Sequence, residues 1–150
     1  MQIDRPMQEK YEKMVEYYDA LYAFKDYQDE AKKLYQFIGE HKRSSGTALL
    51  DVACGTGQHL SFLKKHYQVE GLDINPQMLA IARKRCADGP FHQGDMLDFD
   101  LDRQFDVVTC LFSSIGYAKN VNELNQAINN MTRHLFPGGV LIIERWPNPE

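Results

Sequence analysis

The sequence lacks the long apolar run that a membrane-spanning helix needs, because no apolar stretch approaches about 18 residues. Its polar N-terminus also has no apolar core of the kind found in signal peptides. There is no excess of basic charge, since 17 Lys and Arg stand against 21 Asp and Glu, for a net charge of −4. We therefore expect neither a membrane nor a nucleic acid as a partner.

Cysteine is scarce as well. The three cysteines, Cys54, Cys86 and Cys110, form an odd and scattered set without the spacing of a metal site. They predict a reducing, cytoplasmic location and no bound metal. With 150 residues and no internal repeat or low-complexity linker, the chain has the length of one domain.

The most informative stretch is residues 47–59, which read TALLDVACGTGQH. An apolar run meets a turn of small residues, and an amphipathic segment follows, so the pattern predicts a strand, a tight glycine turn and a helix. Gly55 and Gly57 permit left-handed backbone conformations and a close approach of a ligand to the main chain. The free amide groups at the start of the helix are expected to bind an anionic group.

The residues around this turn narrow the choice of ligand. A dinucleotide site would have a third glycine where Leu60 stands, and the carboxylate of Asp51 would repel a diphosphate. These two features count against an NAD-dependent oxidoreductase, the competing interpretation. A carboxylate suits a ligand with an ammonium group and no phosphate, such as S-adenosylmethionine (SAM).

A second acid, Asp73, follows at the end of the next predicted strand. An acid about 20 residues after a glycine turn accepts hydrogen bonds from ribose hydroxyls. The alternative role for Asp73 is a helix N-cap, because Asn75 and Pro76 follow it.

Hydrophobic patterning extends the alternation of strands and helices over the chain. The near-continuous apolar run at 105–112 is typical of a strand buried on both faces. Asn120 with Glu123 three residues later resembles a capping box. The predicted strands are 47–53, 67–73, 91–93, 105–112 and 140–144. The predicted helices are 8–24, 28–41, 57–66, 76–87 and 120–135. Basic residues at 64–65 and 83–85 are expected to lie on solvated helix faces.

Five segments in order carry a family resemblance: DVACGTG, GLDINPQML, QGDMLDF, FDVVTCLFSSIGY and LFPGGVLIIE. The series resembles the ordered motifs of class I SAM-dependent methyltransferases and covers roughly residues 47–145. Within that class the chain is similar to bacterial enzymes that N,N-dimethylate an amino group on a nucleotide-linked deoxysugar. The finer likeness rests on DVACGTGxHL, CLFSSIGY, IERW with a following proline, and on EYYDALY and FKDY near the N-terminus.

The resemblance implies an α/β fold, a Rossmann-like three-layer sandwich with a mainly parallel sheet. Five of the usual seven strands are present, and the N-terminal helices would form a lid. The chain then divides into a helical lid segment, 1–46, and a SAM-binding domain, 47–150, that is truncated at its C-terminal end. Strand 140–144 would be an exposed edge, which favours pairing with another subunit in a possible homodimer.

The resemblance also assigns the site. Asp95 would accept a hydrogen bond from the adenine amino group, and Met96 would cover the ring. The predicted donor-binding residues are Asp51, Ala53, Cys54, Gly55, Gly57, His59, Asp73, Ile74, Met78, Gly94, Asp95, Met96, Leu111 and Phe112. Tyr18, Tyr117 and Glu144 are the candidates at the acceptor amine, each with a packing or surface role as the alternative. For Cys54 we expect a small residue that fits the turn rather than a reactive thiol.

These observations predict a SAM-dependent methyltransferase that acts on a small-molecule acceptor, an amino group of a nucleotide-linked sugar. The alternative is a non-catalytic module or fragment that binds SAM or its product S-adenosylhomocysteine (SAH). Such a fragment would need a missing C-terminal part or a partner subunit for catalysis.

Overall fold

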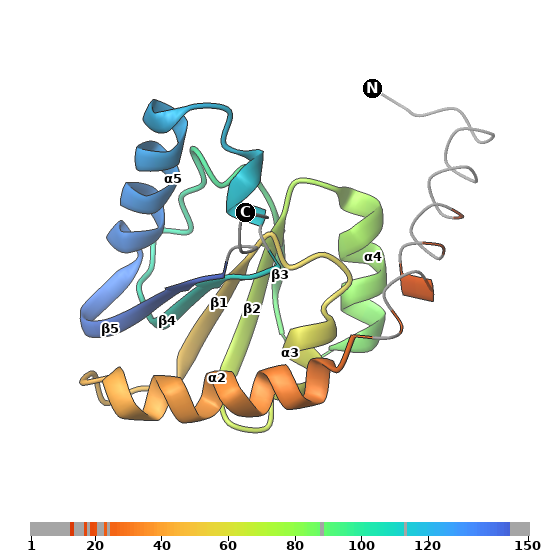
Figure 1. Ribbon diagram of the computed structural model, residues 1–150, viewed down its shortest axis with the longest axis horizontal. Helices are drawn as coiled ribbons and strands as arrows, with labels where there is room; N and C mark the ends of the chain where they lie inside the picture. Colours follow the sequence, from red (N-terminus) through yellow and green to blue (C-terminus); the bar gives the residue numbers. More distant parts are fainter. Residues whose placement is uncertain are drawn as a thin grey trace, which may run out of the picture.

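The computed structural model describes residues 13, 17, 19, 20, 23, 25–87, 89–112 and 114–144. A five-stranded sheet in the order β3-β2-β1-β4-β5 forms its centre, and every pair of neighbouring strands is parallel (Figure 1). The strands are β1 Ala48–Val52, β2 Gln68–Asp73, β3 Phe91–Gln93, β4 Phe105–Cys110 and β5 Leu135–Ile143. The helices are α2 Tyr27–His41, α3 Gln58–Leu63, α4 Pro76–Arg85 and α5 Val121–Arg133, with a 3-10 turn η1 at Ser114–Tyr117.

Helices cover both faces of the sheet. Figure 1 shows α2, α3 and α4 on one side and α5 on the other. Alternate residues of the central strands supply the two cores: Leu49 belongs to the cluster on the first side, and Leu50 to the cluster under α5. Because both faces are buried, β1 and β4 read as nearly continuous apolar runs, interrupted by Asp51 in β1 and by Asp106 and Thr109 in β4. The predicted three-layer α/β sandwich is confirmed.

Helix α2 is a layer of this sandwich. It begins after Asp26, whose carboxylate caps it by accepting a hydrogen bond from the Asp29 amide at 2.9 Å. Its Ala31 and Ile38 are buried in the same core cluster as α3 and α4. The predicted lid can therefore comprise only the segment before α2. Most of that segment, and with it the helix predicted at 8–24, lies outside the described residues.

Several predicted boundaries were wrong by a few residues. Strand β5 begins at Leu135 rather than at 140, because Leu135 already pairs with Phe105. The Pro137–Gly139 turn is thus an irregularity inside the strand, where the register shifts. Strand β4 ends two residues early, since Phe112 turns into the left-handed region at φ 56°. Helices α3, α4 and α5 end two or three residues before their predicted ends.

The strand order decides where a ligand can bind. In a parallel sheet the carboxyl ends of all strands point to the same side, and ligands of doubly wound folds bind at these strand ends. The first strand in sequence, β1, is the central one, with β2 and β4 on either side of it. Among the described strands β3 and β5 are the two edges, as expected for β5.

Candidate ligand-binding site

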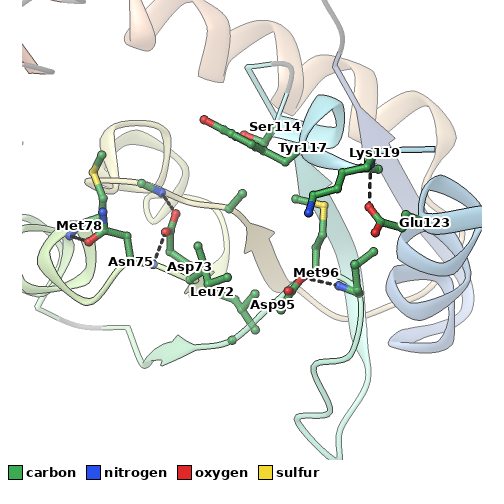
Figure 2. A pocket seen from close by; sticks show the side chains of 16 residues that line it. Leu72, Asp73, Asn75, Met78, Asp95, Met96, Ser114, Tyr117, Lys119 and Glu123 are labelled. Carbon is green, nitrogen blue, oxygen red and sulfur yellow. Dashed lines mark hydrogen bonds between the residues drawn. The ribbon is translucent and has the colours of Figure 1, made fainter. Parts of the chain in front are cut away.

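A pocket of about 440 Å³ opens at the carboxyl ends of the strands (Figure 2). This volume lies within the range of small-molecule sites. A smaller hollow of about 40 Å³ adjoins it, and Ala53, Gly55 and Ser114 line both. All the predicted donor-binding residues except Gly57 line one or both of these cavities, which we call the larger and the smaller pocket.

The glycine turn separates β1 from α3 and forms the boundary between the pockets. Gly55 has a φ of 56°, which favours glycine, and a Cβ there would meet no atom within 4 Å. Gly57 has a φ of 77°, and a Cβ there would lie 3.2 Å from the Cβ of Ala82 in α4. Gly57 therefore serves the packing of the turn against α4, not the pocket wall.

The protein itself uses two amides of the glycine turn. The Gly55 N–H donates to Oδ2 of Asp73 at 2.9 Å, and the Gly57 N–H donates to the Cys54 carbonyl at 3.1 Å. Helix α3 is also only six residues long. The amides of Gly55 and Gly57 are therefore not free donors, and the binding of an anionic group at the start of α3 stays a prediction.

Asp73 ends β2 at the wall of the larger pocket. Its Oδ1 accepts a hydrogen bond from the Asn75 amide at 2.9 Å, while Oδ2 holds Gly55. The N-cap of α4 is Asn75, whose side chain accepts from the amides of Gln77 and Met78. The alternative role of Asp73 as the N-cap is therefore wrong. Each carboxylate oxygen keeps a further lone pair for a ligand hydroxyl.

Asp95 follows β3 at the far end of the same pocket. Its Oδ1 accepts from the Leu97 amide at 3.0 Å, and Oδ2 has no hydrogen-bond partner among the described residues. The main chain of Met96 is fixed by α5, because the Asn130 side chain donates to its carbonyl at 3.2 Å. In Figure 2, Asp95 and Met96 lie between Asp73 and the residues of the opposite wall.

Asp51 lies in the smaller pocket and is almost fully buried, with 2% of its surface exposed. Burial raises the pKa of its carboxyl to about 7; the Thr109 hydrogen bond lowers it, and the nearby Asp73 and Glu144 raise it. The Thr109 hydroxyl donates to Oδ1 at 2.8 Å. A buried carboxyl of this kind is stabilised as a carboxylate by a cation from outside.

His59 is the second buried polar group of the smaller pocket. Its Nε2 and the Oε2 of Glu30 are 3.5 Å apart, and neither atom has a hydrogen-bond partner among the described residues. Burial first, and the charge of Lys25 second, lower the pKa of His59 to about 4, so the ring is neutral near pH 7. A neutral imidazole with an unused nitrogen can bind a polar ligand group.

Two residues that line the pockets have strained backbones. Ala53 and Phe112 are in the left-handed region, with φ of 59° and 56°. For residues other than glycine this conformation costs about 1–2 kcal/mol each.

The face of the Phe112 ring contacts a cation. The Lys25 ammonium lies 4.0 Å from the ring centroid and pairs with the Glu30 carboxylate at 2.9 Å.

The three candidates at the acceptor differ. Tyr117 is 81% exposed and lines the larger pocket, on the wall that also carries Lys119 and Glu123 (Figure 2). Glu144 lines neither pocket; its Oε1 accepts from the Phe112 amide at 3.0 Å. Tyr18 lies outside the described residues.

The contacts of one basic residue, Arg85, were not predicted from the sequence. Arg83 and Lys84 are exposed as expected, but the Arg85 side chain is only 26% exposed. It donates to the Thr56 carbonyl at 2.7 Å and to Asp19 at 3.1 Å. Nothing in the local sequence pattern distinguishes Arg85 from its neighbours.

Cys54 is buried, and burial raises the pKa of its thiol, which fits the expected packing role.

The strand order and the acid-lined pocket define a protein of the Rossmann-like class with its ligand at the carboxyl ends of the strands. Within that class, the chain belongs to the methyltransferase-domain family, whose model matches residues 49–139. The competing dehydrogenase interpretation is thereby removed.

Two curated relatives are similar over most of this chain. It is 44% identical over 140 residues to a dTDP-3-amino-3,6-dideoxy-alpha-D-glucopyranose N,N-dimethyltransferase of Streptomyces fradiae, covering 91% of this chain and 54% of the relative. It is 44% identical over 136 residues to a dTDP-3-amino-3,4,6-trideoxy-alpha-D-glucopyranose N,N-dimethyltransferase of Streptomyces venezuelae, covering 89% of this chain and 57% of the relative. The chain thus spans about half the length of the curated relatives it matches.

A solved structure is similar as well. It is SAM-bound CalS10, described as an amino pentose methyltransferase from Micromonospora echinaspora involved in calicheamicin biosynthesis. The TM-score is 0.83 at 43% identity, over 88% of this chain and 57% of the other. Within the part of this chain that the structure describes, no helix is long and apolar enough to cross a membrane. The same residues contain no cluster of three or more metal-ligating side chains.

Proposed function

We propose that the protein transfers methyl groups from SAM to an amino group of a nucleotide-linked deoxysugar. One observation carries the proposal. Asp95, Asp73 and Asp51 lie within two residues of the ends of β3, β2 and β1, which are neighbours in the sheet in that order. Neighbouring strands are about 4.8 Å apart. The three carboxyls therefore follow the order of adenine, ribose and amino acid along a SAM molecule.

Each of the three carboxyls suits one part of SAM. The free Oδ2 of Asp95 is an acceptor for the adenine amino group, and Met96 adds an apolar surface beside it. Asp73 accepts from the ribose hydroxyls. The buried carboxyl of Asp51 receives the ammonium as counter-charge, and the unpartnered Nε2 of His59 provides a further polar contact at the amino-acid end.

SAM supplies a methyl group already activated by its bond to a sulfonium. As the new C–N bond forms, the C–S bond breaks, its electron pair stays on sulfur, and the amine later loses a proton. The protein's task is to hold a neutral amine in line with the methyl group, which can lower the barrier by several kcal/mol. We assign proton acceptance or relay to Tyr117, which lies on the pocket wall. Glu144 instead positions Phe112 through its amide.

The acceptor class rests on the relatives, whose names specify dTDP-linked amino sugars. We also propose a cytoplasmic location, supported by three buried cysteines that form no disulfide among the described residues. We also propose a homodimer in which two copies pair through β5, an edge among the described strands.

The donor assignment is tested with Asp95→Asn. The change keeps an Oδ1 that can accept from Leu97 but replaces the free acceptor by an amide donor. We expect SAH affinity, measured by calorimetric titration, to fall about tenfold. The matched control is Asp98→Asn, an exposed carboxyl in the same turn that lines neither pocket.

A second ligand makes the test specific. S-inosylhomocysteine carries an oxygen where SAH has the adenine amino group. The wild-type protein should bind it about tenfold more weakly than SAH, and Asp95→Asn should remove that preference. An undiminished preference in the variant would refute the assignment. SAH binding without methyl transfer to a dTDP-linked amino sugar would favour the non-catalytic alternative.

A further inference from the structure

Three residues from distant parts of the chain form a closed set of hydrogen bonds on the glycine turn. The Thr56 hydroxyl donates to Oδ1 of Asp19 at 2.7 Å. One terminal nitrogen of Arg85 donates to Oδ2 of Asp19 at 3.1 Å, and the other donates to the Thr56 carbonyl at 2.7 Å. We call Asp19, Thr56 and Arg85 the turn clasp. Arg85 is suited to this position because its planar guanidinium can bind two acceptors at once.

The turn clasp fixes the conformation of Thr56. Thr56 is 3% exposed and lies between Gly55 and Gly57, both of which have positive φ. Two glycines give a turn many accessible conformations, so hydrogen bonds to the side chain and the carbonyl of the residue between them select one. Gly55 lines both pockets, and hence the conformation of the turn decides how closely a ligand can approach.

We propose that Asp19 and Arg85 are positioning residues, and that through Thr56 they couple the contacts of Asp19 to the binding of the methyl donor. This inference rests on the proposed function. Neither residue lines the larger or the smaller pocket, so both act through the turn rather than by touching the ligand. Coupling of this kind is reciprocal: if the clasp strengthens ligand binding, the ligand strengthens the clasp by the same factor.

The first test is SAH affinity in variants of the clasp. Arg85→Ala and Asp19→Ala should each weaken binding roughly tenfold, within the range usual for coupled sites. The double variant should lose less than the sum of the two single losses, because the Asp19–Arg85 hydrogen bond is removed by either single change. Lys84→Ala, which removes an exposed positive charge from the adjacent position of α4, is the control and should bind like the wild type.

A conservative variant separates geometry from charge. Arg85→Lys keeps the positive charge but offers one ammonium where two separate acceptors are held, so it should behave like Arg85→Ala. Full binding by Arg85→Lys would overturn the geometric argument. If Arg85→Ala does not fold, Asp19→Asn and Asp19→Ala carry the test, because Asp19 lies before α2 and outside both core clusters.

Hydrogen exchange provides a readout that a purely structural role would not change. In the wild-type chain, SAH should slow amide exchange in the peptide that contains Asp19, and this protection should disappear in Arg85→Ala even at saturating SAH. Equal protection in the two proteins would refute the coupling. A wild-type chain that binds no SAH would instead refute the proposed function, and unchanged SAH affinity in all clasp variants would refute only this inference.

Discussion

Replacing Asp51 by asparagine should stabilise the folded protein at alkaline pH while it removes binding of the donor. The carboxyl is buried, and its pKa of about 7 lies roughly 3 pH units above its ordinary value of 3.8. A raised pKa in the folded state means that the native protein holds a proton that the unfolded chain releases. The stability from this proton is complete below about pH 4 and is lost as the pH rises through 7.

The magnitude follows from the linkage between protonation and folding. One pKa unit corresponds to about 1.4 kcal/mol, so ionising Asp51 in the folded state costs at most about 4 kcal/mol at pH 8. At pH 5 the same linkage gives only about 1.7 kcal/mol. The advantage of Asp51→Asn over the wild type should therefore be about 2.5 kcal/mol larger at pH 8 than at pH 5.

The comparison between two pH values isolates the charge. The asparagine can still accept from the Thr109 hydroxyl, while its amide hydrogens need partners in a buried place, but this cost is the same at both pH values. The assay is urea unfolding of both proteins at pH 5 and pH 8, with Asp98→Asn as the exposed control. An advantage that is equal at the two pH values, or larger at pH 5, would refute the reasoning. In the same samples, the loss of SAH binding by Asp51→Asn tests its role toward the ammonium.

Two further predictions concern neighbours of Asp51. Thr109→Val removes the hydrogen bond that lowers the pKa of Asp51. SAH affinity at pH 7 should therefore fall severalfold and recover toward pH 8, whereas Thr109→Ser should bind like the wild type. Calorimetric titration at pH 6, 7 and 8 checks this, and identical pH profiles for Thr109→Val and the wild type would contradict it. Gly57→Ala forces a Cβ toward Ala82 at a φ of 77°. The free energy of unfolding, measured by urea unfolding, should therefore fall by about 1–3 kcal/mol. The control is Gly39→Ala, at an open position of α2.

Most of the fold could be predicted because its pattern is local. A strand buried on both faces is mainly apolar, as in β4, and an amphipathic helix such as α5 repeats its apolar residues with the helical period. The N-cap at Asn120 could also be predicted, since its side chain accepts from the Glu123 amide; the Glu123 carboxylate accepts from the Lys119 amide rather than from that of Asn120, so the capping box is only half formed. The place of α2 was not readable, because an amphipathic helix does not specify the layer that it covers.

The site could be predicted where residues follow strands, and not where contacts join distant segments. Asp51, Asp73 and Asp95 occupy strand ends, so the fold brings them together. The roles of Gly57 and Arg85 depend on α4 packing against the turn, which no spacing in the sequence specifies. The acceptor role predicted for Glu144 rested on its strand end alone, which could not show that one oxygen of its carboxylate accepts from the Phe112 amide.

The position of β1 at the centre of the sheet has a consequence for synthesis. Leu50 pairs with Glu70 on one side and with Val108 on the other, so the second edge of β1 stays unpaired until β4 has emerged from the ribosome. Throughout that interval the nascent chain presents an apolar strand with free backbone groups, a surface to which other nascent chains or chaperones bind. The rate of translation between residues 52 and 110 therefore sets how long the growing chain is exposed to aggregation.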